Sequence, residues 1–277
     1  MEIIDAQIHG VDPVTKWGDG VSHDDVIAAS AELAIASMDA VGVHGALMNW
    51  WPDYVTGYVS RYPGRFAGVP FWGWPQPEPE NAEQAVAELA ATEGIVGTRL
   101  CVGMPNDGSR GRMLNDGAFD AYFNASERHR LPVFVLAHGF LPDLHAAIRS
   151  HPDLVFLIDH VGLNFPVRDQ VAWPGLFDEV PDVVALAELP NVVIKFTAVP
   201  SLSAEPYPFA DVWPHMLKII DAFGVDRMMW GSDITRCRAM HTYRESVDFL
   251  LLSDQVAESD KEMMFSGTVR RWLEWPK

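Results

Sequence analysis

The stretch Ile3-Ile4-Asp5-Ala6-Gln7-Ile8-His9-Gly10 is a short, mostly apolar run that stops abruptly at a histidine. Its form recurs along the chain, because short apolar runs of strand length alternate with longer segments of helical period. Near-continuous apolar runs of this kind are expected of parallel strands that are covered on both faces. The predicted strands are residues 2–8, 45–50, 66–72, 94–100, 131–137, 154–159, 191–196 and 227–231.

Between these runs lie amphipathic segments with apolar residues at three- and four-residue spacing, which predicts helices. They cover residues 24–41, 81–92, 116–130, 140–150, 177–189 and 209–223. Eight strand-then-helix units favour a closed (β/α)8 barrel over an open sheet. Because no linker interrupts this order, residues 1–277 are expected to form one domain, with one or two closing helices over residues 259–277.

Composition and charge narrow the possible functions. The chain is 48% hydrophobic and 21% charged, as expected of a globular protein with a sizeable core. Its 20 Lys and Arg against 38 Asp and Glu give a formal charge of -18, which opposes nucleic acid or an anionic membrane as a partner. Two cysteines are too few for a disulfide framework, and no signal or membrane-spanning pattern is present, so a soluble, cytoplasmic protein is expected.

Three connections are longer than a tight turn needs: residues 10–22, 161–175 and 198–208. Each follows a predicted strand and is rich in Pro, Gly and aromatic residues. Such connections belong to the C-terminal mouth of a barrel, where barrel enzymes keep their chemistry. Their length suggests an enclosed pocket.

His9, His138 and His160 share one placement, because each comes directly after a predicted strand. In a barrel all three therefore point into the same mouth. One such histidine would more often cap its strand or pack under a loop, but three at equivalent positions favour a site. The segment MMWGSDIT adds Asp233, which could be a metal ligand, a general base or both, or could cap the following helix.

Candidate substrate contacts lie at other strand ends. Arg99, in GTRL, is expected to anchor a substrate carboxylate or to form a structural ion pair with an acid of the barrel. Lys195, in NVVIKF, follows the same logic. Aromatic residues after the second and third strands either line the pocket for a flat or cyclic substrate or pack beneath the loops. They are Trp50, Trp51, Trp72, Trp74 and Tyr54.

The segments DAQIH, LAHG, IDHVG and WGSD, in that order over nearly the whole chain, resemble the amidohydrolase superfamily. The resemblance is closer to the amidohydrolase-related branch, which holds aminocarboxymuconate-semialdehyde decarboxylase, resorcylate-type decarboxylases, pyrone-dicarboxylate lactonase and sugar-acid lactonases. It implies a distorted TIM barrel, and a homodimer is an expectation from the resemblance alone. The metal ligands that it implies, when a metal is bound, are Gln7, His9, His138 and Asp233. It further implies that His160 assists a water or a substrate carbonyl and that Arg99 contacts a substrate carboxylate.

Gln7 departs from the pattern of this branch, where the commoner residue is His and some decarboxylases have Glu. A neutral amide oxygen is a weaker ligand than imidazole, so Gln7 should lower the affinity for Zn²⁺, the metal that this ligand set favours. Metal-free lactonases are known within the branch. The sequence therefore leaves both one divalent metal ion and a metal-free site open.

The leading hypothesis is a hydrolase that opens a carboxylate-bearing lactone or related cyclic ester. In it Asp233 accepts a proton from the attacking water, His138 and His160 polarise the carbonyl, and Arg99 orients the substrate. The alternative is a metal-dependent, non-oxidative decarboxylase of an aromatic or dienic acid, in which Asp233 delivers a proton to carbon. A third possibility is a barrel that only binds a small molecule or a partner, which the full set of polar residues at the strand ends disfavours.

Overall fold

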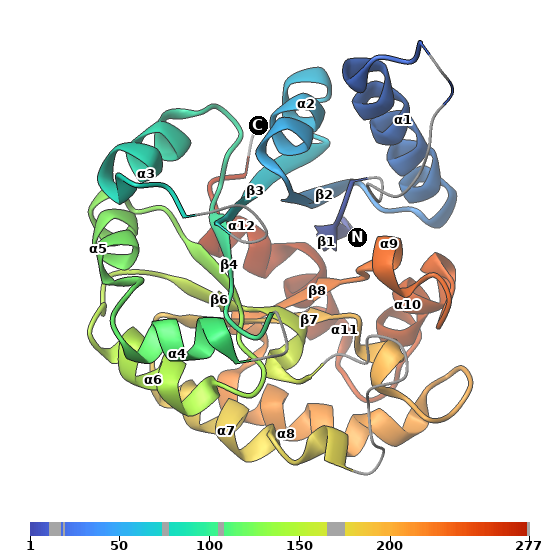
Figure 1. The fold of residues 1–277 in the computed structure, drawn as a ribbon. Coiled ribbons are helices and arrows are strands. Elements are labelled where there is room, and N and C mark those ends of the chain that lie inside the picture. The colour runs from blue at the N-terminus through green and yellow to red at the C-terminus, as the bar shows by residue number, and fades with distance from the viewer. Residues whose placement is uncertain (11–17, 19, 74–77, 105–107, 165–174, 276–277) are drawn as a thin grey trace.

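The computed structural model describes residues 1–277 except 11–17, 19, 74–77, 105–107, 165–174 and 276–277. Eight parallel strands follow one another in the order of the sequence and form a nearly closed barrel, with helices around it (Figure 1). The predicted (β/α)8 barrel is therefore confirmed. The strands are β1 Ile4–Ile8, β2 Gly45–Trp50, β3 Phe66–Trp72, β4 Thr98–Cys101, β5 Val133–Leu136, β6 Phe156–Ile158, β7 Val192–Thr197 and β8 Met228–Gly231.

The first helix, His23–Val41, is capped at both ends. Ser22 and Asp25 form a capping box at the start of α1, and Gly42 ends that helix with a φ of 79°. The helices are α1 His23–Val41, α2 Pro52–Arg61, α3 Ala82–Ala91, α4 Ser109–Asn115, α5 Asp120–His129, α6 Leu141–Arg149, α7 Val180–Ala185, α8 Trp213–Phe223, α9 Ile234–Cys237, α10 Tyr243–Leu251, α11 Glu258–Glu262 and α12 Thr268–Trp272. None of those described combines the length and apolarity that crossing a bilayer requires.

Side chains alternate between the two faces of each strand, and this alternation decides which polar groups enter the barrel. On β7, Val192, Ile194 and Phe196 belong to the core between the strands and the helices. Val193 belongs to a second core inside the barrel. Lys195, two residues further on, therefore shares the inner face and is fully buried.

A backbone hydrogen bond and the side chain of Asp5 join β8 to β1 and complete the barrel. The backbone N–H of Asp233 donates to the carbonyl oxygen of Gln7 at 3.1 Å. Next to this bond the Asp5 carboxylate accepts the backbone N–H of Ser232 at 2.8 Å, the Ser232 hydroxyl, and the Tyr243 hydroxyl at 2.8 Å. Burial raises the pKa of Asp5 to about 6, although these hydrogen bonds act in the opposite direction.

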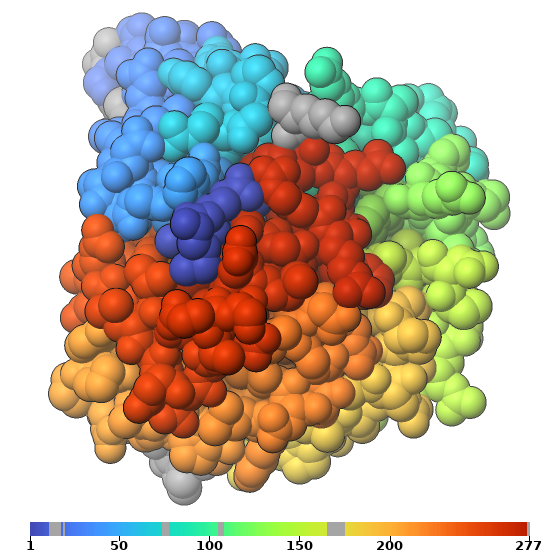
Figure 2. Space-filling view, turned by 180° about the vertical axis from the view of Figure 1, so that it is seen from behind, coloured from blue at the N-terminus to red at the C-terminus, as the bar shows by residue number. Residues whose placement is uncertain are grey.

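The predicted closing helices are present at the other end of the barrel. Helix α11, a π-helical turn over Met263–Gly267 and α12 follow one another directly. The ring of Trp275 covers the start of β2, because a Cβ added at Gly45 would lie 2.7 Å from it. Arg270 of α12 holds Glu2 through two hydrogen bonds of 2.6 and 2.7 Å, and Figure 2 shows the N-terminal and C-terminal segments side by side.

Several element boundaries differ from the predictions, for local reasons. The helix expected over residues 116–130 is α5, which begins only at Asp120 because Gly117, at a φ of 73°, separates it from α4. Residues 94–97 precede β4, and Gly94 has a φ of 78° that a strand does not allow. The helix expected over 177–189 shortens to α7 and a 3-10 turn, and α2 was not among the predicted helices. Most of the connections 10–22 and 161–175 lies outside the described residues.

Candidate active site

The C-terminal ends of β1, β6, β7 and β8 bring Gln7, His9, His160, Lys195 and Asp233 together. All five side chains are buried, with at most 4% of each residue exposed. His160 and Asp233 have φ values of 52° and 49°, in the left-handed region that non-glycine residues adopt rarely. Such backbone conformations cluster at functional sites, which fits the chemistry predicted for these residues.

Asp233 pairs with His9 at the centre of this group. His9 Nε2 lies 2.9 Å from Asp233 Oδ1, and His9 Nδ1 donates to the backbone carbonyl oxygen of Asn49. His160 Nε2 is 3.9 Å from Asp233 Oδ2. Burial opposes ionisation of Asp233, but His9, His160 and Arg99 together hold its pKa below the usual value. At neutral pH Asp233 is therefore a carboxylate that can accept a proton.

Gln7 connects the two histidines to Lys195. Its side-chain nitrogen lies 3.2 Å from His9 Nε2 and 3.3 Å from His160 Nε2. Its side-chain oxygen accepts a hydrogen bond from Lys195 Nζ. The amide therefore presents its NH₂ group to the imidazoles and its oxygen to the lysine.

Asp159 holds the two buried cations of the site. Arg99 Nε donates to Asp159 Oδ2 at 2.6 Å, and Lys195 Nζ donates to Asp159 Oδ1 at 2.8 Å. The positive charges of Arg99 and Lys195 overcome the effect of burial and hold the pKa of Asp159 well below its usual value. Of the two roles open for Arg99 in the sequence, the ion pair with an acid of the barrel is the one seen here.

His138 stands apart from the other predicted site residues. Its ring lies against Gly103, where an added Cβ would be 2.8 Å from it. Burial lowers its pKa, and its Nδ1 has no hydrogen-bond partner among the described residues. No hydrogen bond or ion pair in the described part of the chain joins His138 to His9, His160 or Asp233, so the predicted ligand set is only partly brought together.

The aromatic residues predicted to line the pocket lie in two different regions. The Trp50 ring meets His9 edge-on at 5.2 Å and stacks on Trp51 at 5.2 Å, next to the site. Trp72 instead stacks on Tyr122 of α5 at 4.2 Å, in the core outside the barrel. Tyr54 packs in the same outer core, and Trp74 lies outside the described residues.

The described residues do not form a site for a metal ion. Within the described ranges, no three His, Cys, Asp or Glu side chains are grouped so that they could hold one. His9 Nε2 and Asp233 Oδ1 are close enough to share an ion, but the neighbouring Gln7 offers a donor there, and a cation needs an acceptor. The predicted ligand set does not fit a divalent metal in this arrangement.

Two contributors to the site were not recognised in the sequence. Asp159 binds both cations, and the backbone oxygen of Asn49 fixes one tautomer of His9. A signal for Asp159 was present, because it ends the sixth predicted strand while Arg99 and Lys195 place two cations on other inner strands. The Asn49 contact uses only backbone, so its side chain carries no signal.

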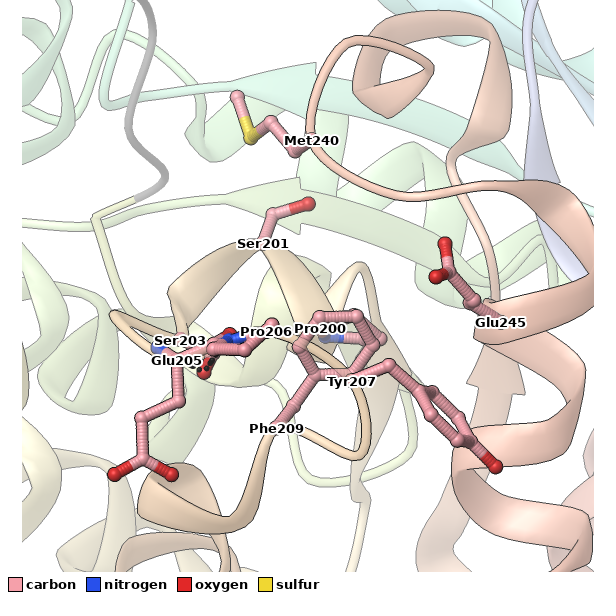
Figure 3. A pocket seen from close by; sticks show the side chains of 9 residues that line it. All are labelled: Pro200, Ser201, Ser203, Glu205, Pro206, Tyr207, Phe209, Met240 and Glu245. Carbon is pink, nitrogen blue, oxygen red and sulfur yellow. Dashed lines mark hydrogen bonds between the residues drawn. The ribbon is translucent and has the colours of Figure 1, made fainter.

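A cavity of about 430 Å³ opens at the same end of the barrel, after β7 and β8 (Figure 3). Two carboxylates line it, Glu205 and Glu245, together with hydroxyl groups such as that of the nearly buried Ser201. None of the described residues that line it is Lys or Arg. The cavity has the size of a small-molecule pocket, and its described lining carries no positive charge.

A family model described as amidohydrolase matches residues 4–275. The L-fucono-1,5-lactonase of Burkholderia ambifaria is 29% identical over 165 residues, which are 58% of this chain. The match covers 53% of that lactonase, so the similarity spans about half of its length.

Two solved structures share the whole fold. An amidohydrolase from Burkholderia multivorans, with bound zinc, has a TM-score of 0.75 at 17% identity and covers 98% of both chains. A probable 2-pyrone-4,6-dicarboxylic acid hydrolase from Acinetobacter baumannii, with citric acid bound, has a TM-score of 0.72 at 16% identity, over 98% of this chain and 99% of that one. At these identities the likeness extends to the fold alone.

Proposed function

The chain belongs to the amidohydrolase family, and from that premise we propose that it hydrolyses a lactone, with Asp233 as the base for the attacking water. The observation that carries the proposal is the buried Asp233 carboxylate beside His9 and His160 at the mouth of the barrel. A carboxylate at neutral pH, next to neutral imidazoles, is suited to accept a proton from water. The lactonase that is 29% identical over part of the chain supports the same reaction class.

The residues of the chain account for each proton in this reaction. The oxygen of water forms a bond to the lactone carbonyl carbon while its proton passes to Asp233. The imidazole of His160 lies next to Asp233, where it can orient the substrate carbonyl. When the ring C–O bond breaks, Asp233 returns the proton to the leaving oxygen, and the product is an open hydroxy acid.

The charges of the site support an uncharged, hydroxyl-rich lactone. Arg99 and Lys195 carry two positive charges, which the carboxylates of Asp159 and Asp233 balance. The described lining of the cavity at the same end of the barrel adds carboxylates and hydroxyls but no cation. Because Arg99 and Lys195 are already paired with Asp159, a substrate carboxylate would have to compete with a buried aspartate for either cation, which is unfavourable. This ranks sugar-type lactones above the carboxylate-bearing lactones expected from the sequence.

The test is the Asp233→Asn variant, assayed by acid release in a pH-stat with uncharged aldonolactones and dicarboxylate lactones. The change removes the base while keeping the shape of the side chain, so kcat should fall by about 10²-fold or more. Asp254→Asn, a change of the same kind at an exposed residue, should retain full activity.

The outcomes separate the hypotheses. Hydrolysis that is unchanged in Asp233→Asn removes Asp233 as the base. Carbon dioxide release from an aromatic or dienic acid, without lactone opening, would favour the decarboxylase. Faster turnover of dicarboxylate lactones than of aldonolactones would contradict the charge argument and return Arg99 to the role of carboxylate anchor.

A further inference from the structure

Lys195 fixes which end of the Gln7 amide faces the histidines. The ammonium group has no acceptor, so the atom that it contacts on Gln7 must be the oxygen. The opposite orientation would set the NH₂ group against the ammonium, two donors facing each other in a fully buried place. The amide therefore cannot turn while Lys195 stays where it is.

Lys195 is itself held firmly. Asp159 accepts its second hydrogen bond at 2.8 Å, and the Phe134 ring lies 5.2 Å from Nζ. Arg99 binds the other oxygen of the same carboxylate at 2.6 Å, so Asp159 is fixed from both sides. The orientation of Gln7 thus rests on a chain of buried contacts that begins at Arg99.

The position that the NH₂ group fills is the one that the first-strand ligand of a metal ion would need. The amide nitrogen is within 3.3 Å of Nε2 of both His9 and His160, so its hydrogens point at the nitrogens that would bind a metal. His9 Nε2 and Asp233 Oδ1 lie 2.9 Å apart, so the amide hydrogens enter a space that two potential metal ligands border. The ammonium of Lys195, directly behind the amide, adds a further positive charge against a divalent cation.

We propose that Lys195, acting through Gln7, closes this site to divalent metal ions, so that hydrogen-bond donors of the chain stand where a metal would otherwise bind. Lys195 is a positioning residue in this arrangement, because it acts only by holding the amide. The proposal does not depend on which substrate is hydrolysed, and its test needs no substrate.

Gln7→Glu tests the proposal with almost no change in shape. One carboxylate oxygen keeps the hydrogen bond from Lys195, while the other presents an acceptor to the site in place of the NH₂ group. After equilibration with Zn²⁺ and desalting, elemental analysis should find about one zinc ion per chain in Gln7→Glu and a small fraction of that in the unaltered protein. Calorimetric titration should show a zinc affinity that is higher by about tenfold or more, the scale on which altered contacts change metal sites.

The controls localise the effect. Gln84→Glu makes the same chemical change on the exposed surface of α3 and should leave zinc binding unaltered. Adding Asp233→Asn to Gln7→Glu should abolish the gain. Lys195→Met frees the amide and should also raise zinc binding, with a melting curve to show that the variant is folded.

Two results would overturn the proposal, and both are distinct from a failure of lactone hydrolysis. One is stoichiometric zinc in the unaltered protein that is lost in Asp233→Asn. The other is a folded Gln7→Glu protein that binds no more zinc than the unaltered chain.

Discussion

His160 lies 4% exposed between Asp159, Asp233 and the Gln7 amide. Burial lowers its pKa to about 4, and the charges of Arg99 and Lys195 add to this effect. Asp233 and Asp159 act in the opposite direction but do not cancel it. Since the pKa of Asp233 also lies below its usual value, neutral His160 and ionised Asp233 coexist over most of the pH range.

The pH dependence of hydrolysis should show this directly. Protonation of His160 or Asp233 removes the active form, so kcat/KM should stay level from about pH 7.5 down to about pH 5.5 and fall only at more acidic pH. An exposed histidine in the same role would give an acid limb near pH 6.5. Initial rates measured from pH 3.5 to 7.5 check the prediction, and a midpoint near 6.5 would contradict the assigned burial of His160.

Among the elements, the seam between β8 and β1 has the most unusual construction. The Asp5 carboxylate bonds both backbone and side chain of Ser232 and also Tyr243 of α10. In Asp5→Asn one oxygen becomes an NH₂ group that faces hydroxyl and N–H donors. The expected loss in the free energy of unfolding is about 2 kcal/mol, as for other buried, charged hydrogen-bond acceptors.

The same residue makes the seam sensitive to pH. The pKa of Asp5 rises from 3.8 when unfolded to about 6 when folded, so between these values the folded chain holds a proton that the unfolded chain has lost. Its contribution to stability is therefore largest below about pH 4 and decreases as the pH rises toward 6, by up to about 3 kcal/mol. Urea unfolding of the unaltered chain and Asp5→Asn from pH 4 to 7 measures it; a difference between them that grows with pH would refute this sign.

The eight strands were predictable because each carries its own apolar run, and their ends placed His9, His160 and Asp233 correctly at one mouth. The contacts of Gln7 were not predictable. Lys195 is 188 residues away in sequence, and the barrel brings the two together by setting Lys195 opposite Met229 on β8. A sequence pattern indicates that a residue is buried, but not which distant side chain it contacts.

The positions of His138 and Trp72 also could not be predicted from the sequence. Both follow or end a strand as expected, yet His138 has no bond to the other site residues among those described, and Trp72 turns to α5. Which of the two faces a residue at a strand end takes depends on twist and register, and a shift of one residue reverses it. Strand ends alone cannot decide this.

Over the whole molecule, the formal charge of -18 acts against the folded state by self-repulsion. Salt screens this repulsion, because the Debye length falls to about 10 Å at 0.1 M. Raising NaCl from about 20 to 300 mM should therefore increase the melting temperature, by about 2–4 °C if screening contributes about 1 kcal/mol. Differential scanning calorimetry checks the rise.

A charge-reduced variant provides the control for this prediction. Glu80→Gln, Glu93→Gln and Asp254→Asn together remove three negative charges from exposed positions. Its melting temperature should rise less with salt than that of the unaltered chain. An equal rise in both proteins would point to a salt effect other than charge screening.

The left-handed residues at the strand ends have a consequence for how this protein could evolve or be engineered. Of the six described non-glycine residues with positive φ, His160, Val161, Ala198 and Asp233 follow β6, β7 and β8. Each holds a backbone conformation that costs about 1–3 kcal/mol, so the fold is least relaxed where its chemistry is arranged. Glycine would remove this conformational cost at each of the four positions, but at His160 and Asp233 it would also remove the reactive side chain. At His160 and Asp233 a relaxed backbone and the reactive side chain therefore exclude each other. Val161 packs in the core, so Ala198, which would lose only a methyl group, is the position where glycine should add stability.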